Sequence, residues 1–355
     1  MTLALSVLDQ CPVPDGSTGA DALRHTLDLA RAAEALGYRR YWLAEHHNTS
    51  SLAATAPEVL VAAVASATST IRVGSGGVML SHYSPLKVAE TFRTLAALYP
   101  GRIDLGVGRT PGSDPVAEAA LQYLPGVPGD ERYDEKVVDL VGFVRGGLEP
   151  GHPFESVRAM PDGGPAPDVW LLGSSSHSGA IAAYLGLPFA FAHFITSAFG
   201  PQVMAAYHRG FQAVEQAAVP QAAVAVSVIC AETDAEADRL ARSADVWRLR
   251  PEGSGRGPLL APEDAAAVPL TALDETMIAQ GREAMVVGAP DRVRDRLGAL
   301  ATAFAVDELL VVTICHDPVA RLRSYRLLAE AFSPADRSAS TTGPSPGPGR
   351  HPARP

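Results

Sequence analysis

The sequence predicts an α/β fold of the (β/α)8 TIM-barrel type. Eight short apolar runs rich in β-branched and aromatic residues alternate with longer segments whose apolar residues recur at helical spacing. A doubly wound open sheet would need a Gly-rich phosphate-binding turn after its first strand, but the first run leads into Asp9-Gln10-Cys11-Pro12. The expected strands are Leu3–Leu8, Arg40–Ala44, Ile71–Met79, Ile103–Val107, Val169–Leu172, Phe189–His193, Ala223–Cys230 and Glu308–Thr313.

Several of the helical segments between these strands carry start and stop signals. Asp21 precedes the first segment as a candidate N-cap, and Gly37 follows it as a C-terminal glycine should. Pro57 can occupy the first turn of the second segment, and Ser84-Pro85 opens the third. The clearest expected helices are Ala22–Leu36, Pro57–Thr68, Leu86–Leu98 and Arg292–Phe304.

Three stretches interrupt the alternation because they are rich in Gly and Pro or lack apolar periodicity. Gly146–Asp168 is expected to form a long connection before the fifth strand. Arg250–Pro269 is a second long loop, and such a loop in a compact domain is usually a lid or disordered. The tail Ser333–Pro355 is predicted to be disordered. We therefore expect one barrel over residues 1–332 with two insertion loops, followed by a disordered tail over residues 333–355.

The composition is that of an acidic globular protein. The chain has 355 residues, 47% of them apolar, and 29 basic against 39 acidic residues give a net charge of −10. Such a surface repels nucleic acid and anionic membranes, so neither is expected as a partner. The sequence has no apolar run of about 18 residues and no signal-peptide pattern, which predicts a cytoplasmic protein. Cys11, Cys230 and Cys315 are too widely separated for a C-x-x-C motif.

Ionisable residues gather where the second predicted strand ends, in Glu45-His46-His47. The active site of a parallel barrel is built from the loops at the carboxyl ends of its strands. A histidine at this position can act as a general acid or base, or hold an anionic reactant. The alternative interpretation is an exposed polar loop without a function.

Three further strands carry residues suited to a flat, phosphorylated ligand. Gly76 and Gly77 lie within the third strand, where a ring could approach the backbone closely, although a β-bulge would also explain them. Arg109 follows the fourth strand and can pair with an anion. The hydroxyl-rich run Ser174–Ser178 precedes a helical segment and resembles a phosphate cradle, whereas simple helix capping would need only one serine.

The chain resembles the bacterial luciferase-like flavin-dependent monooxygenases. The resemblance is carried by residues 37–47 (GYRRYWLAEHH), 72–90 (RVGSGGVMLSHYSPLKVAE) and 100–109 (PGRIDLGVGR), and it spans about Leu3 to Phe332. It implies an enzyme that uses reduced FMN and dioxygen, through a C4a-peroxyflavin, to oxygenate a small organic substrate such as a polyketide or another secondary metabolite. The type of oxygenation and the substrate are not readable from the sequence.

The resemblance also implies roles for individual residues. His46 matches the family's catalytic histidine, with Glu45 and His47 beside it. Gly76-Gly77 falls where the family has a non-prolyl cis peptide under the isoalloxazine ring. The FMN phosphate site is matched by Arg109, Ser174, Ser175 and Ser178.

Two departures from the family pattern bear on the expected flavin site. His193 falls where the luciferase α subunit has a tryptophan near the flavin, which suggests a more polar pocket. A second phosphate-binding arginine of luciferase has no clear counterpart around Tyr133, which suggests a weaker anion site.

Partners follow from the same reasoning. No dinucleotide-binding fingerprint is visible, so a separate NAD(P)H:flavin reductase is expected to supply the reduced cofactor. By the family resemblance we expect a homodimer, and the Ala- and Leu-rich segments Pro57–Thr68 and Leu86–Leu98 are suited to pair two barrels. These faces could instead only cover the sheet.

Four other functions were weighed. A metal-dependent hydrolase could use histidines such as His82 and His316, but the first strand lacks the H-x-H pair of many such barrels, so no metal is expected. A Schiff-base aldolase needs a lysine inside the barrel, and both Lys87 and Lys136 fall in helical patterns. An F420-dependent oxidoreductase and a non-catalytic flavin-binding protein remain as alternatives.

Overall fold

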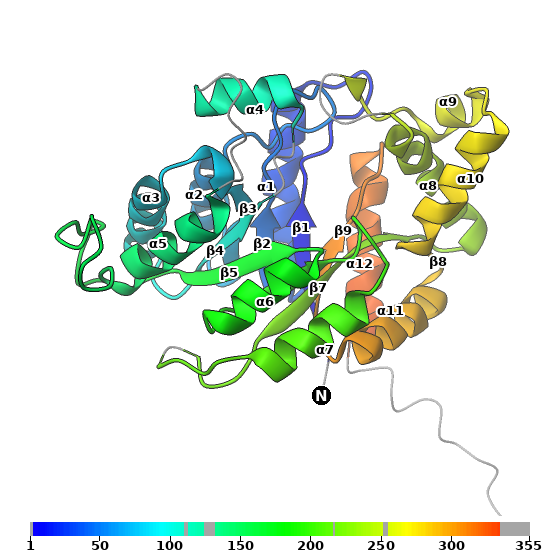
Figure 1. Cartoon of the computed structure of the whole chain (residues 1–355). Helices are drawn as coiled ribbons and strands as arrows, with labels where there is room; N and C mark the ends of the chain where they lie inside the picture. Colours follow the sequence, from blue (N-terminus) through cyan, green and yellow to red (C-terminus); the bar gives the residue numbers. More distant parts are fainter. Residues whose placement is uncertain (1–2, 110–112, 124–131, 216, 251–254, 334–355) are drawn as a thin grey trace, which may run out of the picture.

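A computed structural model of the chain describes residues 3–109, 113–123, 132–215, 217–250 and 255–333. Eight parallel strands close into a barrel, because β1 pairs with β2 on one side and β9 on the other, and β7 pairs with both β6 and β9 (Figure 1). The eight predicted strands are all present. They are β1 (Ala4–Asp9), β2 (Arg40–Leu43), β3 (Arg72–Met79), β4 (Ile103–Gly108), β5 (Asp168–Gly173), β6 (Phe189–Ala192), β7 (Ala222–Cys230) and β9 (Glu308–Val312).

A ninth strand, β8 (Met285–Gly288), pairs with the last four residues of β7 outside the closed barrel, and the sequence did not predict it. Helices connect and cover the strands, with α4 and α9 at the upper end of the barrel in Figure 1. The helices are α1 (Gly19–Ala35), α2 (Pro57–Ala67), α3 (Pro85–Leu98), α4 (Pro115–Gln122), α5 (Tyr133–Arg145), α6 (Ser176–Tyr184), α7 (Gly200–Gly210), α8 (Asp234–Arg248), α9 (Pro262–Ala267), α10 (Ala272–Glu283), α11 (Pro290–Phe304) and α12 (Pro318–Phe332).

The predicted helix signals hold with one correction. Helix α1 is capped by Thr18, whose side chain accepts a hydrogen bond from the Asp21 backbone N–H, so Asp21 is the third residue of a capping box and not the cap. Gly37 follows the α1 C-cap at φ +80°, a conformation that favours glycine. Pro57 and Pro85 occupy the first turns of α2 and α3.

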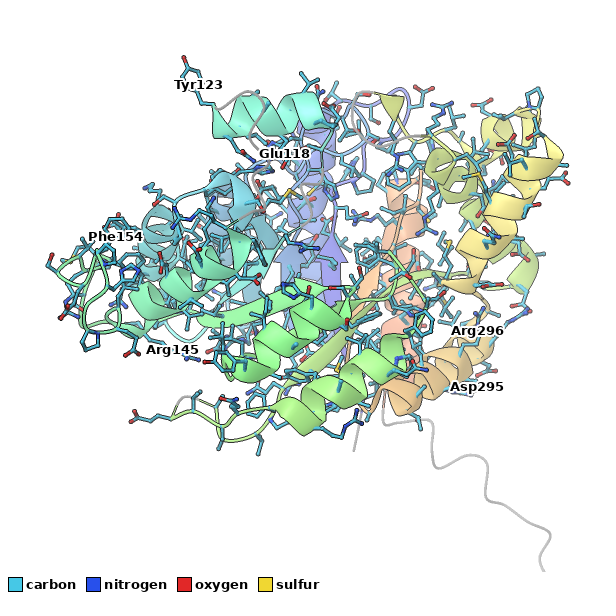
Figure 2. The ribbon with its side chains drawn as sticks, in the orientation of Figure 1. Glu118, Tyr123, Arg145, Phe154, Asp295 and Arg296 are labelled. Carbon is cyan, nitrogen blue, oxygen red and sulfur yellow. The ribbon has the colours of Figure 1, made fainter. Side chains whose placement is uncertain are left out.

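The predicted loops are largely connections, but the second is tied to the barrel. Between α5 and β5 the chain forms turns and bends, and Phe154 projects from it with 54% of its surface exposed (Figure 2). In the Arg250–Pro269 segment, buried Leu259 pairs with Pro14, and α9 begins three residues later. Beyond Ser333, the predicted tail lies outside the described residues. No described helix is both long enough and apolar enough to cross a membrane.

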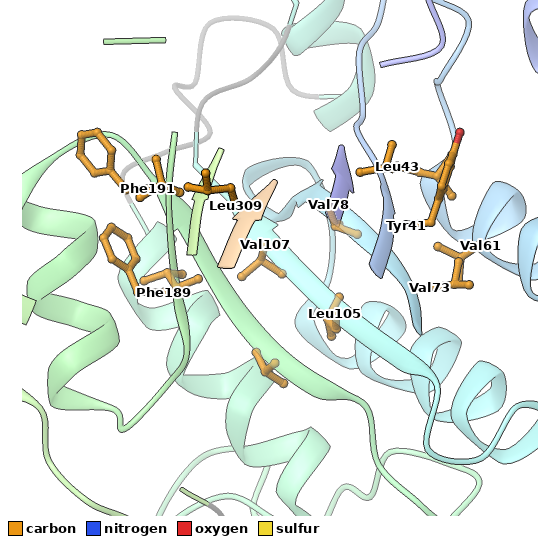
Figure 3. Close-up of a cluster of buried hydrophobic side chains, with 14 of the residues drawn as sticks. Tyr41, Leu43, Val61, Val73, Val78, Leu105, Val107, Phe189, Phe191 and Leu309 are labelled. Atoms are coloured by element: carbon orange, nitrogen blue, oxygen red, sulfur yellow. The ribbon is translucent and has the colours of Figure 1, made fainter. Parts of the chain in front are cut away.

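Strand alternation divides the apolar residues into an outer and an inner core. Tyr41 and Leu43 point outward and pack with residues of the surrounding helices, such as Val61 of α2 (Figure 3). Trp42 and Ala44 point inward and belong to a second buried cluster in and above the barrel. Successive strand residues face opposite sides, so the parity of a residue decides which core it joins.

The amino-terminal end of the barrel interior is closed by a network of charges. Arg40 donates to Glu308 (Nε to Oε1, 2.7 Å) and to Asp104 (Nη1 to Oδ2, 2.9 Å). Asp104 also accepts hydrogen bonds from Trp42 Nε1 at 2.9 Å and from Arg72 Nε at 3.0 Å. All four charged groups therefore have partners at this end.

Candidate active site

A cavity of about 320 Å3 opens at the carboxyl ends of the strands, where the sequence predicted the site. It is bordered by six of the predicted site residues, contributed by β2 to β5 and the loops that follow them. These residues are Glu45, His46, Gly76, Gly77, Arg109 and Ser174. The fold thus brings most of the predicted site to one place.

His46 directly borders the cavity and is half-buried. Its backbone N–H donates to Ala54 O at 2.8 Å, which fixes the loop, while its Nδ1 has no hydrogen-bond partner among the described residues. Burial, assisted by the neighbouring Arg256 and His47, lowers the pKa of His46 from 6.5 to about 4. His46 is therefore a neutral imidazole at neutral pH.

Glu45 and His47 are held differently from His46. The buried Glu45 carboxylate accepts hydrogen bonds from the Met79 backbone N–H at 2.9 Å and the Tyr83 hydroxyl at 2.6 Å. His47 Nε2 lies 2.7 Å from Glu45 Oε1, and His47 does not border the cavity. Glu45 thus joins the end of β2 to the end of β3 and orients its neighbours.

Gly76 and Gly77 form one wall of the cavity and are joined by a cis peptide bond, as the resemblance implied. A Cβ on Gly76 would lie 2.5 Å from Leu8 Cδ1, and one on Gly77 would lie 2.7 Å from Gly106 O. Packing against the Gly106 backbone therefore requires glycine at position 77, whereas a side chain at position 76 would displace Leu8. The wall consists of backbone without side chains, and a flat ring can lie against it.

The end of the cavity at Arg109 lies near Tyr133, a residue whose role sequence reasoning missed. Arg109 and Ser174 border the cavity at the ends of β4 and β5. The Tyr133 hydroxyl, at the start of α5, is buried without a hydrogen-bond partner among the described residues. Burial raises the pKa of Tyr133, and the Arg109 charge acts on it in the opposite direction, so the two groups are near each other. The region around Tyr133, where no second arginine was found, thus offers a hydroxyl donor.

Besides His47, three predicted residues lie outside the cavity lining. Ser175 caps α6, since its hydroxyl accepts a hydrogen bond from the Ser178 backbone N–H at 3.3 Å and lies 3.2 Å from the Ser178 hydroxyl. His193 does not border the cavity; its ring packs edge-on against Phe304 of α11, with ring centroids 5.6 Å apart. Its parity is that of the outward-facing Phe191, which places it on the outer side of β6.

The other missed residues come from the end of α8 and from the loops that follow β1 and α8. Gln10, Trp247, Arg248 and Arg256 all border the cavity. Arg256 belongs to the segment predicted as a long loop, which was the only sequence signal for this group. Among the described residues, no cluster of three or more His, Cys, Asp or Glu side chains is arranged to hold a metal ion.

Comparisons with known proteins agree with this geometry. A relative from Bacillus subtilis, N-acetyl-S-alkylcysteine monooxygenase, is 36% identical over 94% of this chain and 100% of its own length. The crystal structure of apo-MsnO8 is 44% identical, with a TM-score of 0.85, covering 93% of this chain and 98% of that chain.

More distant solved structures share the fold. One is the oxygenating component of 3,6-diketocamphane monooxygenase from Pseudomonas putida in complex with FMN, at 19% identity and a TM-score of 0.68 over 94% of this chain and 99% of that chain. Another is an F420-dependent secondary alcohol dehydrogenase, at 16% identity and a TM-score of 0.67 over 94% and 100%. Proteins of this fold thus bind FMN or F420. The family model for luciferase-like monooxygenases matches residues 3–307, and the chain therefore belongs to the luciferase-like monooxygenase family.

Proposed function

We propose that this protein is a monooxygenase that binds reduced FMN in the cavity at the carboxyl ends of the strands. The observation that carries the proposal is the arrangement of that cavity. A bare backbone wall at Gly76-Gly77, an anion-binding end at Arg109 and a neutral imidazole at His46 border the same space. The luciferase-like family and its monooxygenase relatives support the same reaction type.

The residues present fit FMN. Its phosphate would be held by the Arg109 guanidinium and the Ser174 and Tyr133 hydroxyls, and the buried Tyr133 hydroxyl would gain the partner that it lacks. The isoalloxazine ring would lie against Gly76-Gly77. When bound, reduced FMN supplies the two electrons with which one atom of dioxygen is transferred to the substrate and the other leaves as water.

The chain itself contributes proton handling and exclusion of water. Neutral His46 can hold a proton on one ring nitrogen and accept one on the other, so an imidazole bordering the cavity is suited to general acid or base assistance. Leu8, Leu172, Phe194 and Leu310 supply apolar walls. These walls keep water from the reacting groups, which protects a reactive intermediate from hydrolysis.

A small organic substrate is supported by two observations. At about 320 Å3 the cavity is near the lower end of the range for ligand pockets, roughly 300–1,000 Å3. The relative from B. subtilis is named for monooxygenation of N-acetyl-S-alkylcysteine, which is also a small organic molecule. The particular substrate, including the polyketide class expected above, stays a prediction.

Two partners belong to this proposal. A separate NAD(P)H:flavin reductase would supply the reduced cofactor, as the absence of a dinucleotide-binding fingerprint in the sequence predicts. A second copy of the chain would pack against α2 and α3, where Val59 and Leu98 are 62% and 65% exposed. A dimer mass in light scattering at micromolar concentration is expected, and a monomer mass would contradict the homodimer.

The experiment that tests the function is an anaerobic titration of the full chain with reduced FMN and, in parallel, with reduced F420. We expect reduced FMN to bind with a micromolar Kd and reduced F420 to bind at least tenfold more weakly. Turnover is then measured with NADH alone and with an added flavin reductase. Binding of reduced F420 in place of FMN would favour the F420-dependent alternative, and stoichiometric NADH oxidation by the chain alone would contradict the two-component scheme.

A further inference from the structure

We propose that Arg248, assisted by Arg256, forms a second anion-binding subsite in the cavity, which takes the carboxylate of a small organic acid. This subsite is distinct from the anion-binding end at Arg109 and Tyr133. The inference rests on the proposed function, because it assigns the substrate class of the same cavity. It is nevertheless tested by binding, without any turnover.

Arg248 is the last residue of α8, and its guanidinium reaches back into the barrel. Its Nη2 donates to the hydroxyl of Ser227 at 2.9 Å, and Ser227 has the parity of Ala225, which borders the cavity from β7. A guanidinium has five N–H donors, and this is the single hydrogen bond that Arg248 makes within the described part of the chain. The remaining donors are available to a ligand.

Arg256 brings a second positive charge to the same wall. Its guanidinium lies 4.4 Å from the ring centroid of Trp247, and its Nη2 donates to Arg250 O at 3.0 Å. The Arg256 backbone is held as well, because its carbonyl accepts a hydrogen bond from the Thr49 hydroxyl at 3.2 Å. Stacking and backbone anchoring thus place this cation before any ligand arrives.

The Asp245 and Glu45 carboxylates are hydrogen-bonded to groups other than Arg248. The Asp245 carboxylate near Arg248 is bound at both oxygens by Arg282, at 2.6 and 2.7 Å. Glu45, which also borders the cavity, is hydrogen-bonded to Met79, Tyr83 and His47. Burial lowers the pKa of Arg248 to about 10, and the Arg282 and Arg256 charges act in the same direction against the favourable effect of Asp245. An anion beside Arg248 would offset this cost.

A carboxylate matches these donors because its two coplanar oxygens fit the guanidinium fork. The surroundings describe the rest of the molecule, since Leu52, Phe194 and Trp247 line the cavity with apolar surface. Arg256 also lies close enough to His46 to lower the pKa of that histidine. A small acid with an apolar body would therefore have its carboxylate fixed at Arg248 and its body near the imidazole.

The test compares two ligands of nearly the same shape, (phenylthio)acetate and 2-(phenylthio)acetamide, by calorimetry on the full chain with and without FMN. We expect the carboxylate to bind at least tenfold more tightly than the amide. Arg248→Gln should remove that difference, Arg248→Lys should keep part of it, and Arg256→Gln should reduce it. Arg296→Gln, on the exposed face of α11 (Figure 2), is the matched control and should change nothing.

Equal affinity of the wild-type protein for acid and amide would overturn the proposal. So would an Arg248→Gln variant whose FMN affinity falls while its preference for the acid persists, since the guanidinium would then serve the cofactor. If Arg248→Gln does not fold, as judged by circular dichroism, the wild-type comparison and Arg256→Gln still decide. Preference for the acid in a chain that binds no FMN would contradict the proposed function and leave the subsite intact.

Discussion

The two ends of the barrel treat polar groups in opposite ways. At the amino-terminal end, Arg40, Asp104 and Glu308 are buried and hydrogen-bonded to one another. At the carboxyl end, His46 Nδ1 and the Tyr133 hydroxyl are buried with no hydrogen-bond partner among the described residues. The charged groups at the amino-terminal end are therefore paired, although the neighbouring Trp170 Nε1 has no partner among the described residues, whereas the groups at the carboxyl end that border the site are left without one.

This difference separates stability from function. A buried polar group without a partner costs about 1–3 kcal/mol, so a chain retains such groups where a ligand supplies what the protein does not. Breaking a buried charge network is expensive because it leaves an uncompensated charge, and the amino-terminal end of a TIM barrel is typically the stabilising end. Substitutions at the amino-terminal end should therefore lower the free energy of unfolding, and substitutions at the carboxyl end should change oxygenation or FMN binding.

The largest effect is expected from His46→Ala at the carboxyl end. Loss of general acid or base assistance should lower the oxygenation rate by about 10²–10⁴-fold. FMN affinity should change little, because phosphate recognition lies at Arg109, and more hydrogen peroxide should form for each reduced flavin consumed. Stopped-flow absorbance and peroxide assays measure both. His47→Ala is the comparison: normal turnover in His46→Ala together with impaired turnover in His47→Ala would show that the wrong histidine was assigned.

At the other end, Asp104→Asn should destabilise the protein and spare the site. Arg40 and Arg72 would lose a shared buried carboxylate, at a cost of about 3–5 kcal/mol in the free energy of unfolding. Denaturant unfolding measures this cost. Asp28→Asn, which removes the exposed Asp28–Arg31 pair, is the matched control and should cost no more than about 0.5 kcal/mol. Similar losses in the two variants would contradict the division between the ends.

Arg109→Gln and Tyr133→Phe should weaken FMN binding to different degrees. Arg109→Gln removes a charge-assisted contact and should raise the Kd of FMN about 10–100-fold. Tyr133→Phe removes a neutral hydrogen bond and should raise this Kd about 2–10-fold. In the absence of FMN, Tyr133→Phe should leave stability unchanged or raise it by up to about 1 kcal/mol, because it removes a buried hydroxyl without a partner. Fluorescence titration and thermal unfolding provide the two readouts. A destabilised Tyr133→Phe with normal FMN affinity would argue for a structural hydroxyl.

The smallest effect concerns acid stability. The folded pKa of His46 is lowered from 6.5 to about 4, so below pH 6.5 the unfolded chain takes up a proton that folded His46 does not. Stability should therefore fall between pH 6.5 and about 4 and then level off. Because the ring is partly exposed to the cavity, we expect about 1 kcal/mol at pH 5 from this residue. Urea unfolding at pH 7 and at pH 5 measures the fall in the free energy of unfolding between the two pH values. This fall should be smaller in His46→Asn than in the wild-type protein, and an equal fall would contradict the lowered pKa.

The sequence determined the barrel and the core of the site because both depend on local patterns. Apolar runs of strand length marked all eight barrel strands, and the rule that barrel sites form at the carboxyl ends of strands selected His46, Gly76-Gly77 and Arg109. Strand β8 was not predicted, and it is the strand that pairs with β7 outside the closed barrel. His193 was predicted to lie near the flavin, but its ring packs against Phe304 on the outer side of β6. Its position two residues after the outward-facing Phe191 could have indicated this direction.

Only the tertiary structure decided which helix and loop residues complete the cavity. Arg248 ends α8 and borders the cavity, and Tyr133 starts α5 near Arg109, but the helical pattern of neither segment marks these residues. Their positions depend on how each helix packs after its strand, and Arg256 depends on the anchoring of its loop at Thr49. Side chains distant in sequence meet in the cavity only after the barrel has closed. Which groups meet there is a property of the closed barrel, and no single segment of the chain encodes it.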